Sequence, residues 1–335
     1  MNEIEQKNRR AEEQKKLEEV IKIINERDNF IITSHIRPDG DSLGSQISLF
    51  LILKGLGKRV IIINEDNPPA HFSFLPHLSE ILQPDDNRKD VALILDVNEI
   101  ERLGIRTKKI IERIPLKINI DHHLGGAIGN ISWMDENASS VCEMIYRLIK
   151  AFSIQHSGFR MNKDIALLLY VGIATDTGFF SFRNTTPSAL RICASLLEYG
   201  IEPSKIKEEL YSTKTLNELR LFGKALSNLK MNGSIVSARI TEEMIEEANR
   251  EPETGTLLDL MRGIKDSRVI LLFRELSPSR TKVSLRSKEG FDVRSIAALF
   301  GGGGHLCAAG CILPLPIEEA EEKIMSCLKA SYMFA

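Results

Sequence analysis

The sequence predicts an α/β protein in which a parallel sheet with helices on both faces precedes a helical linker and a smaller α/β domain. Continuous apolar runs separated by helical segments indicate the sheet, because parallel strands buried on both faces are apolar along their whole length. A polar helical stretch followed by a new strand pattern after Asn232 indicates the second domain. The predicted boundaries are residues 1–199 for the first domain, 200–224 for the linker and 225–335 for the second domain.

The first domain is expected to begin with a helix over residues 1–27, whose apolar face lies in its second half. Four apolar runs are predicted as buried strands, at 30–32, 59–64, 91–96 and 116–121. Helical segments are predicted at 43–53, 141–152, 163–177 and from Pro187 onward. The alternation of strands and helices is typical of a parallel sheet that is covered on both faces.

The second domain is expected to combine strands and helices in a different order. Its predicted strands are 234–240, 269–275 and 282–287, and a helix is predicted at 293–300. The glycine run from Gly301 to Gly304, with His305 after it, follows that helix, and a last strand and helix complete the pattern. The polar stretch before this pattern is predicted to link the domains rather than to enter a core.

Composition narrows the classes of function. The chain has 335 residues, 43% of them hydrophobic, and a net charge of −2. Near-neutral charge disfavours a protein that coats long nucleic acid, although a local basic pocket for a short anion is compatible with it. No apolar run reaches the ~18 residues of a membrane span, and the charged N-terminal stretch is unlike a signal peptide. The five cysteines show no paired zinc spacing, which favours a reduced, cytoplasmic setting.

Three predicted strands end in side chains that could bind a metal ion. The candidates are His35, Asp39 and Asp41 after the first strand, Asp96 at the end of another, and Asp121, His122 and His123 at the end of a third. Because the carboxyl ends of parallel strands meet at one edge of a sheet, these side chains are expected to lie together. Asp176 interrupts a strongly apolar helix. A buried carboxylate there is costly unless it is paired or bound to a metal.

Each of these features also has a simpler interpretation. Asp96 could cap the following helix, residues 121–123 could form a hydrogen-bonded turn, and Asp176 could mark a helix end. Four such coincidences at matching positions of one fold are improbable, and the sequence therefore favours a centre of two divalent cations. Two such cations would neutralise the roughly four negative charges that Asp39, Asp41, Asp96 and Asp176 bring.

The motifs His35-x-x-x-Asp39-x-Asp41, Asp96, Asp121-His122-His123 and Asp176 resemble the four motifs of the DHH phosphoesterase family. The glycine run, followed by Ala308-Ala309-Gly310, resembles the signature of the DHH-associated C-terminal domain. Together these motifs cover nearly the whole chain beyond the N-terminal helix. By size and plan the chain is most similar to the stand-alone nanoRNase (oligoribonuclease) and pAp phosphatase subgroup.

The resemblance implies a role for each candidate residue. One metal would be held by His35, Asp39 and Asp96, and the other by Asp41, Asp96, His122 and Asp176, with Asp96 bridging the two. Asp121 would orient the ligands, and His123 would lie beside the substrate phosphate. The family suggests Mn²⁺, and the mixture of carboxylate and imidazole donors also admits Mg²⁺, Co²⁺ or Fe²⁺.

Arg286 and His305, together with the backbone N–H groups of Gly302, Gly303 and Gly304, are expected to bind a terminal phosphate or the neighbouring nucleotide. Glycine lets a backbone approach phosphate closely, although such a run could also be a flexible connection. The implied substrates are short oligoribonucleotides and 3′-phosphoadenosine 5′-phosphate (pAp), in a cleft between the two domains. The family also suggests a homodimer formed through the first domain.

The expected activity is that of a Mn²⁺-dependent phosphodiesterase and phosphatase that converts short RNA to mononucleotides, pAp to AMP, or both. A phosphodiesterase for cyclic-di-AMP or its linear product pApA is the main alternative. A family II pyrophosphatase and a RecJ-type exonuclease fit less well, because the glycine run is foreign to the former and the chain is short for the latter. A non-catalytic RNA-binding module is a remote alternative, since no metal-ligand motif is lost.

Overall fold

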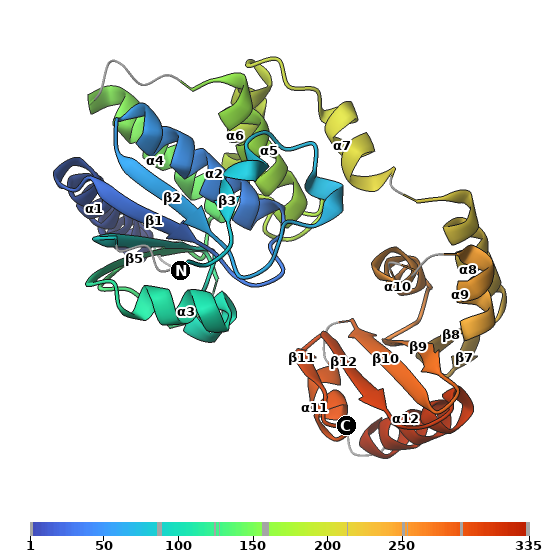
Figure 1. The fold of residues 1–335 in the computed structure, drawn as a ribbon. Coiled ribbons are helices and arrows are strands. Elements are labelled where there is room, and N and C mark those ends of the chain that lie inside the picture. The colour runs from blue at the N-terminus through green and yellow to red at the C-terminus, as the bar shows by residue number, and fades with distance from the viewer. Residues whose placement is uncertain are drawn as a thin grey trace. The chain divides into compact units, whose positions relative to one another are not determined.

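The computed structural model describes residues 3–85, 89–123, 125–126, 128–155, 161–212, 214–249, 252, 254–288 and 291–332. The chain divides into two compact units, Met1–Thr213 and Lys214–Ala335, each built on its own sheet (Figure 1). Among the described helices, none combines the length and apolarity that a membrane crossing requires.

The first unit contains a six-stranded sheet in which every neighbouring pair is parallel, as predicted. The strands are β1 (Asn29–Thr33), β2 (Arg59–Ile63), β3 (Ile81–Leu82), β4 (Val91–Leu95), β5 (Leu116–Asp121) and β6 (Ile131–Met134). Their order is β3-β2-β1-β4-β5-β6. The chain leaves β1 for β2 on one side and reaches β4 on the other, so the order reverses between β1 and β4. In parallel sheets, ligands bind beyond the carboxyl ends of the strands at such a reversal.

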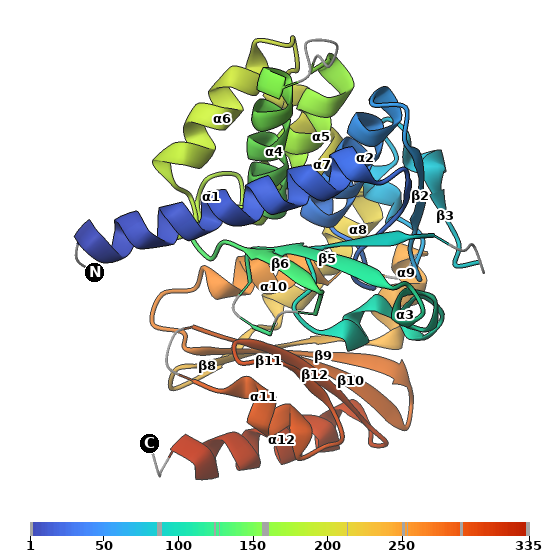
Figure 2. The same ribbon diagram turned by 90° about the vertical axis from the view of Figure 1, so that its left-hand side faces the viewer.

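Helices cover both faces of this sheet (Figure 2). The α-helices are α1 (Glu3–Glu26), α2 (Gly40–Gly55), α3 (Ile105–Glu112), α4 (Val141–Gln155), α5 (Lys163–Asp176), α6 (Pro187–Leu197) and α7 (Pro203–Tyr211), and the 3₁₀ turns are η1 (Ala70–Phe72), η2 (Leu78–Glu80) and η3 (Ile100–Leu103). In β1, Phe30 and Ile32 face the larger core under α1, α2, α4 and α5, whereas Ile31 faces the smaller core under α3. The continuous apolar run in this strand therefore fills two cores at once.

Two glycines allow α2, α4 and α5 to pack unusually closely. A Cβ on Gly44 of α2 would lie 2.4 Å from the backbone oxygen of Leu168 in α5. A Cβ on Gly172 of α5 would lie 2.1 Å from Sγ of Cys142 in α4. Any larger side chain at either position would push these helices apart. The start of α2, the start of α4 and the end of α5 thus approach one another closely.

The second unit contains a six-stranded mixed sheet with the order β11-β12-β10-β9-β8-β7. Its strands are β7 (Lys230–Asn232), β8 (Ile235–Ile240), β9 (Val269–Ser277), β10 (Arg280–Ser287), β11 (Gly303–His305) and β12 (Ala308–Leu313), and its helices are α8 (Leu216–Ser227), α9 (Glu242–Ala248), α10 (Gly255–Arg262), α11 (Val293–Ala298) and α12 (Ile317–Tyr332). The pair β8–β9 is parallel, and the other pairs are antiparallel. One face packs against α11 and α12, and the other against α8, α9 and α10.

The segment 200–224 is shared between the two units instead of forming a separate linker. Ile206 and Leu210 of α7 are buried in the core of the first unit. Leu221 and Phe222 of α8 are buried in the core of the second unit. Each helix is amphipathic, so the polar residues that suggest a linker are the solvent-facing sides of two core helices.

Candidate metal centre

The turn after β1 places His35 and Asp39 beside each other. Asp39 is the N-cap of α2: its Oδ1 accepts the backbone N–H of Ser42 at 3.0 Å, and the Ser42 hydroxyl accepts the N–H of Asp39 at 2.8 Å. This capping box leaves Oδ2 of Asp39 3.7 Å from Nε2 of His35. A capping role and a ligand role are therefore compatible, because they use different oxygens of one carboxylate.

The ring of His35 is oriented by the backbone. Its Nδ1 lies 2.8 Å from the carbonyl oxygen of Ile36, which can only accept, so Nδ1 carries the proton. Nε2 then points toward Asp39 and toward Asp96, whose Oδ2 is 3.2 Å away, so a cation between these groups could take its lone pair. An imidazole fixed in this way by a carbonyl is typical of metal ligands.

Asp96 lies at the middle of the cluster, directly after β4. Its side chain is buried, and its backbone has a φ of +59°, which aspartate tolerates better than most residues. Oδ2 faces His35, while Oδ1 lies 3.3 Å from Nδ1 of His123 and 3.9 Å from Nε2 of His122. One carboxylate thus faces three imidazoles that come from the ends of two other strands.

Asp121, the last residue of β5, holds the following two histidines. Its Oδ1 accepts the backbone N–H groups of His122 and His123 at 2.7 and 3.1 Å. The same oxygen lies 2.8 Å from Nδ1 of His123. The side chain of Asp121 is fully buried, whereas that of His123 is 41% exposed. The buried carboxylate therefore fixes an imidazole that solvent and ligands can reach.

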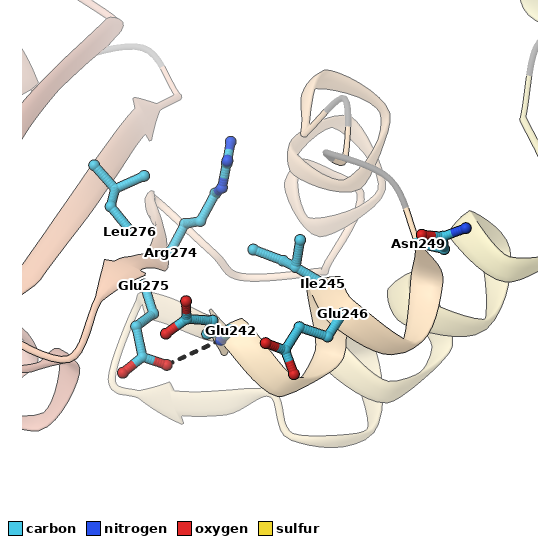
Figure 3. Close-up of a pocket in the computed structure, with 7 residues that line it drawn as sticks. All are labelled: Glu242, Ile245, Glu246, Asn249, Arg274, Glu275 and Leu276. Carbon is cyan, nitrogen blue, oxygen red and sulfur yellow. Dashed lines mark hydrogen bonds between the residues drawn. The ribbon is translucent and has the colours of Figure 1, made fainter.

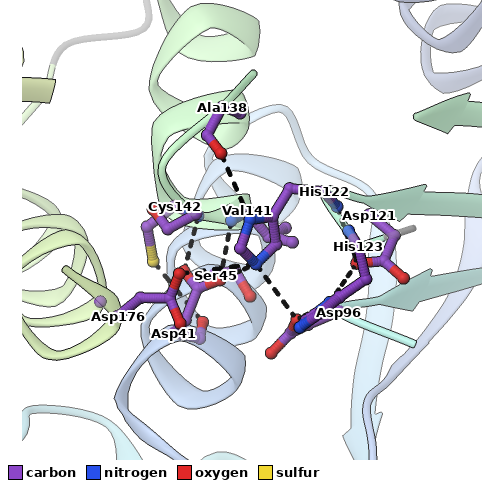
Figure 4. A network of polar contacts seen from close by, with 12 residues as sticks. Asp41, Ser45, Asp96, Asp121, His122, His123, Ala138, Val141, Cys142 and Asp176 are labelled. Carbon is purple, nitrogen blue, oxygen red and sulfur yellow. Dashed lines mark hydrogen bonds and ion pairs between the residues drawn. The ribbon is translucent and has the colours of Figure 1, made fainter. Parts of the chain in front are cut away.

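The second half of the cluster combines Asp41, His122 and Asp176 (Figure 4). Nε2 of His122 lies 4.0 Å from Oδ2 of Asp41 and 3.6 Å from Oδ2 of Asp176. Asp41 accepts the backbone N–H groups of Val141 and Cys142 at 2.7 and 2.8 Å, at the N-terminus of α4. A helix N-terminus stabilises a carboxylate there.

Three overlapping groups in the described part of the chain could each hold a cation. They are His35, Asp39 and Asp96; Asp41, His122 and Asp176; and Asp96, Asp121, His122 and His123. Within each group, one donor atom from every residue lies within 4.8 Å of the others. The eight residues that the sequence predicts for this edge of the sheet thus come together.

Burial opposes the accumulation of negative charge in the cluster. Burial, with the charge of Asp96 next in importance, raises the pKa of Asp41 to about 7. Burial and the charges of Asp41 and Asp96 raise the pKa of Asp176 to about 8. Burial would also raise the pKa of Asp96, but hydrogen bonds with His123 and His35 hold it below its usual range.

The donor set fits divalent cations. Nε2 of His122 is buried and has no hydrogen-bond partner among the residues that the structure describes. Its Nδ1 lies 3.3 Å from the carbonyl oxygen of Ala138, which makes Nδ1 the protonated nitrogen and leaves a lone pair on Nε2. That lone pair faces two carboxylates whose pKa values are raised by burial and by neighbouring carboxylates. A cation would satisfy all three groups.

The predicted substrate-binding residues lie in the second unit, on one end of its sheet. Across β12, both Arg286 of β10 and His305 of β11 pair with Ala308. A Cβ on Gly302 would lie 2.3 Å from the carbonyl oxygen of Gly310, whereas a Cβ on Gly303 would meet nothing within 4 Å. The side chain of His305 lies outside the described residues.

Gly304 and Arg286 differ in how strongly the structure constrains them. Gly304 has a φ of +143°, and a Cβ there would lie 2.4 Å from the carbonyl oxygen of Ala308. Arg286 is half-buried, and burial lowers the pKa of its guanidinium. Its Nη1 donates to the carbonyl oxygen of Leu285 at 3.0 Å. A half-buried guanidinium with donors to spare is a suitable anion-binding group.

A cavity of about 290 Å³ lies at the opposite end of β9 and contains none of the predicted site residues (Figure 3). Its lining residues are Glu242, Ile245, Glu246, Asn249, Arg274, Glu275 and Leu276. Three glutamates and one arginine make this lining acidic on balance, which disfavours an anionic ligand there.

Two residues near the centre carry no sequence motif and are absent from the predictions. Asn184 donates from Nδ2 to Oδ2 of Asp176 at 3.2 Å. Glu143, fully buried in the first turn of α4, accepts from the backbone N–H and the hydroxyl of Ser139. Only the polar residues Asn137, Ser139 and Ser140 before an apolar helix could have indicated that the start of this helix makes polar contacts.

Comparison with known proteins agrees with this geometry. The model of the DHH family, N-terminal domain, matches residues 29–173, and the model of the DHHA1 domain matches residues 232–332. The bifunctional oligoribonuclease and PAP phosphatase NrnA of Thermus thermophilus is 30% identical over 305 residues, which are 89% of this chain and 88% of that protein. The Bacillus subtilis protein of the same name is 32% identical over 296 residues, 87% of this chain and 91% of that protein.

Among solved structures, an exopolyphosphatase-related protein from Bacteroides fragilis has a TM-score of 0.85 and 29% identity, and the match covers 95% of this chain and 96% of that one. The two matched ranges lie in different units, and the range 29–173 contains the motif positions from His35 to His123. The resemblance predicted from the motifs is therefore confirmed, and the chain belongs to the DHH family, with a DHHA1 domain after its DHH domain.

Proposed function

We propose that the chain is a two-metal phosphoesterase that hydrolyses short oligoribonucleotides to mononucleotides and pAp to AMP. The observation that carries the proposal is the position of Asp96, which belongs to the same candidate group as His35 and Asp39 and lies 3.9 Å from the imidazole of His122, a member of the Asp41–His122–Asp176 group. The names of the two similar proteins, oligoribonuclease and PAP phosphatase, support the choice of substrates.

In this proposal His35, Asp39 and Asp96 hold one cation, and Asp41, Asp96, His122 and Asp176 hold the other. The oxygen and nitrogen donors suit Mn²⁺, and also Mg²⁺, Co²⁺ or Fe²⁺. When bound, such a pair of cations lowers the pKa of a coordinated water and offsets charge on the phosphoryl oxygens.

Asp121 orients His123 on the side of the centre that faces solvent. Hydrogen bonds to Asp121 and Asp96 raise the pKa of His123 to about 10, so in the metal-free chain its ring is protonated at neutral pH. Asp121 binds Nδ1 of this ring, which leaves its Nε2–H available as a donor. We propose that this N–H binds a substrate phosphate oxygen.

The second unit supplies the phosphate-binding groups in this proposal. The backbone of Gly302, Gly303 and Gly304, with Arg286 and His305, would bind a terminal phosphate or the neighbouring nucleotide. Gly303 supports this role because it leaves open space beside the strand, whereas Gly302 and Gly304 are required by packing against β12. The cytoplasmic location and the homodimer stay predictions.

A substrate panel tests the proposal. With Mn²⁺ present, the enzyme is incubated with pAp, pApA, a five-nucleotide RNA, a long RNA, cyclic-di-AMP, pyrophosphate and polyphosphate. We expect turnover of the short linear nucleotides, little turnover of the others, and loss of all activity in excess EDTA. Preference for cyclic-di-AMP or for an inorganic phosphate chain would contradict the proposed substrates. If the metal-loaded protein turned over none of these compounds, the proposal that the chain is a phosphoesterase would be contradicted.

A further inference from the structure

One turn at the start of α4, residues 138–142, contacts two of the three side chains of the Asp41–His122–Asp176 group directly. The carbonyl oxygen of Ala138 accepts from Nδ1 of His122. The backbone N–H groups of Val141 and Cys142 donate to the two oxygens of Asp41. Figure 4 shows these contacts converging from the end of α4 onto the cluster.

Asn184 extends the reach of this turn to the third side chain. Its Nδ2 donates to the carbonyl oxygen of Ser139 at 3.0 Å and to Oδ2 of Asp176 at 3.2 Å. It also lies 3.1 Å from the carbonyl oxygen of Asp176. One amide therefore ties the end of α5 to the start of α4 and fixes the rotation of the Asp176 carboxylate.

The turn itself is held by a buried carboxylate. Oε2 of Glu143 accepts from the backbone N–H of Ser139 at 2.9 Å and from its hydroxyl at 2.7 Å. Oε1 accepts from Arg147 and from the hydroxyl of Ser188, both at 2.8 Å. Because the Glu143 side chain is fully buried and every contact is charge-assisted, the turn has one strongly preferred conformation.

The other half of the centre does not depend on this turn. His35 is oriented by the carbonyl of Ile36, and Asp39 is oriented by Ser42 in the capping box of α2. Neither residue has a hydrogen bond to residues 138–142 among the described contacts. The two halves of the centre are thus supported by separate elements.

We propose that Asn184 and Glu143 are positioning residues that set the cation affinity of the Asp41–His122–Asp176 site and leave the His35–Asp39–Asp96 site unaffected. This inference rests on the proposed two-cation function. Partners that orient metal ligands typically contribute 10–100-fold to metal affinity. The effect is selective because only one group of ligands is oriented through the turn.

The test is Mn²⁺ binding by isothermal titration calorimetry and electron paramagnetic resonance on the full chain and on Asn184→Ala. We expect the native chain to bind two Mn²⁺ ions that are magnetically coupled. In Asn184→Ala, one site should keep its Kd while the other weakens about 10–100-fold, so that one equivalent gives the signal of an isolated ion. The matched control is Asn162→Ala, which removes the N-cap at the far end of α5 and should keep two native sites.

Two further variants make the outcome decisive. Asp39→Asn should weaken the His35–Asp39–Asp96 site and leave the Asp41–His122–Asp176 site, which Asn184 contacts, intact. The double variant Asp39→Asn, Asn184→Ala should therefore lose tight Mn²⁺ binding altogether. Glu143→Gln removes the charge that holds Arg147 and should weaken the same site in the same direction. Two unchanged sites in Asn184→Ala, or equal weakening of both sites in Glu143→Gln, would overturn the inference alone. A native chain that binds no Mn²⁺ would overturn the two-cation proposal with it.

Discussion

Replacing Asp96 by asparagine separates the proposed chemistry from the fold. The amide keeps the size of the side chain and one acceptor oxygen but removes the charge that both candidate metal sites face. Metal-based stabilisation of a transition state amounts to several kcal/mol. A loss of about 4 kcal/mol corresponds to about a 10³-fold fall in kcat, since each 1.4 kcal/mol changes a rate tenfold.

The same substitution has a second consequence that can be measured without substrate. The charge of Asp96 contributes to the raised pKa values of both Asp41 and Asp176. Removing that charge should lower both values in the metal-free protein. Titration of the two carboxyl groups by carbon-detected NMR would follow this shift while the far-UV circular dichroism stays native.

The matched control is Asp164→Asn. Asp164 lies in the same unit, 48% exposed, and its contact with His77 at 3.2 Å is a surface pair worth about 0–1 kcal/mol. We expect this control to keep native kcat and native Mn²⁺ stoichiometry. An Asp96→Asn enzyme that folds, binds two Mn²⁺ ions and turns over pAp at the native rate would refute the assignment of Asp96 as a shared ligand.

Three other predictions concern proton linkage and packing. Because the pKa values of Asp41 and Asp176 lie above their ordinary 3.8, their contribution to the stability of the metal-free fold is present at low pH and is lost as pH rises through about 7 to 8. Because cations displace those protons, the affinity for Mn²⁺ should rise over this pH range. Calorimetry in two buffers of different ionisation enthalpy measures the protons released, and an affinity that does not change with pH would contradict this prediction. Gly302→Ala should destabilise the second unit by about 1–3 kcal/mol in urea and raise KM, whereas Gly303→Ala should leave stability unchanged; equal effects would contradict the packing argument. Arg147→Met should lower the free energy of unfolding in urea by about 3–5 kcal/mol, because it leaves the buried acidic partners of Arg147 without a positive charge. A loss below about 1 kcal/mol would contradict the argument that these ion pairs stabilise the fold.

Most of the first unit could be predicted because continuous apolar runs mark its central strands. β4 reads Val91–Leu95 and is buried at every position, which is typical of parallel strands. Once the sheet is parallel, residues that follow different strands must share an edge, and the convergence of Asp41, Asp96 and His122 follows from topology alone. Asp176 was predictable for a different reason, since a carboxylate in so apolar a helix demands a partner.

Other features depend on contacts that no local pattern encodes. β3 has only two residues, and β6 begins beyond a glycine-containing loop, so neither gives a periodic signal. Asn184 acts on Ser139, 45 residues away, and its own neighbourhood reads as an ordinary polar loop. The division of the segment 200–224 between the two units could not be predicted, because the sequence pattern of an amphipathic helix is the same whichever core its apolar face packs against.

The charges of the centre also explain how it can be assembled before a cation arrives. In the metal-free chain, protons on Asp41 and Asp176 limit the repulsion, and imidazoles paired with Asp96 offset the rest. These protons occupy positions where cations would otherwise supply positive charge. Cation binding is therefore coupled to proton release. The backbone and α4 hold the ligand side chains in place while a cation replaces the protons. We therefore expect chelation to abolish activity and to leave a measurable Tm for the first unit; loss of its unfolding transition on chelation would contradict this account.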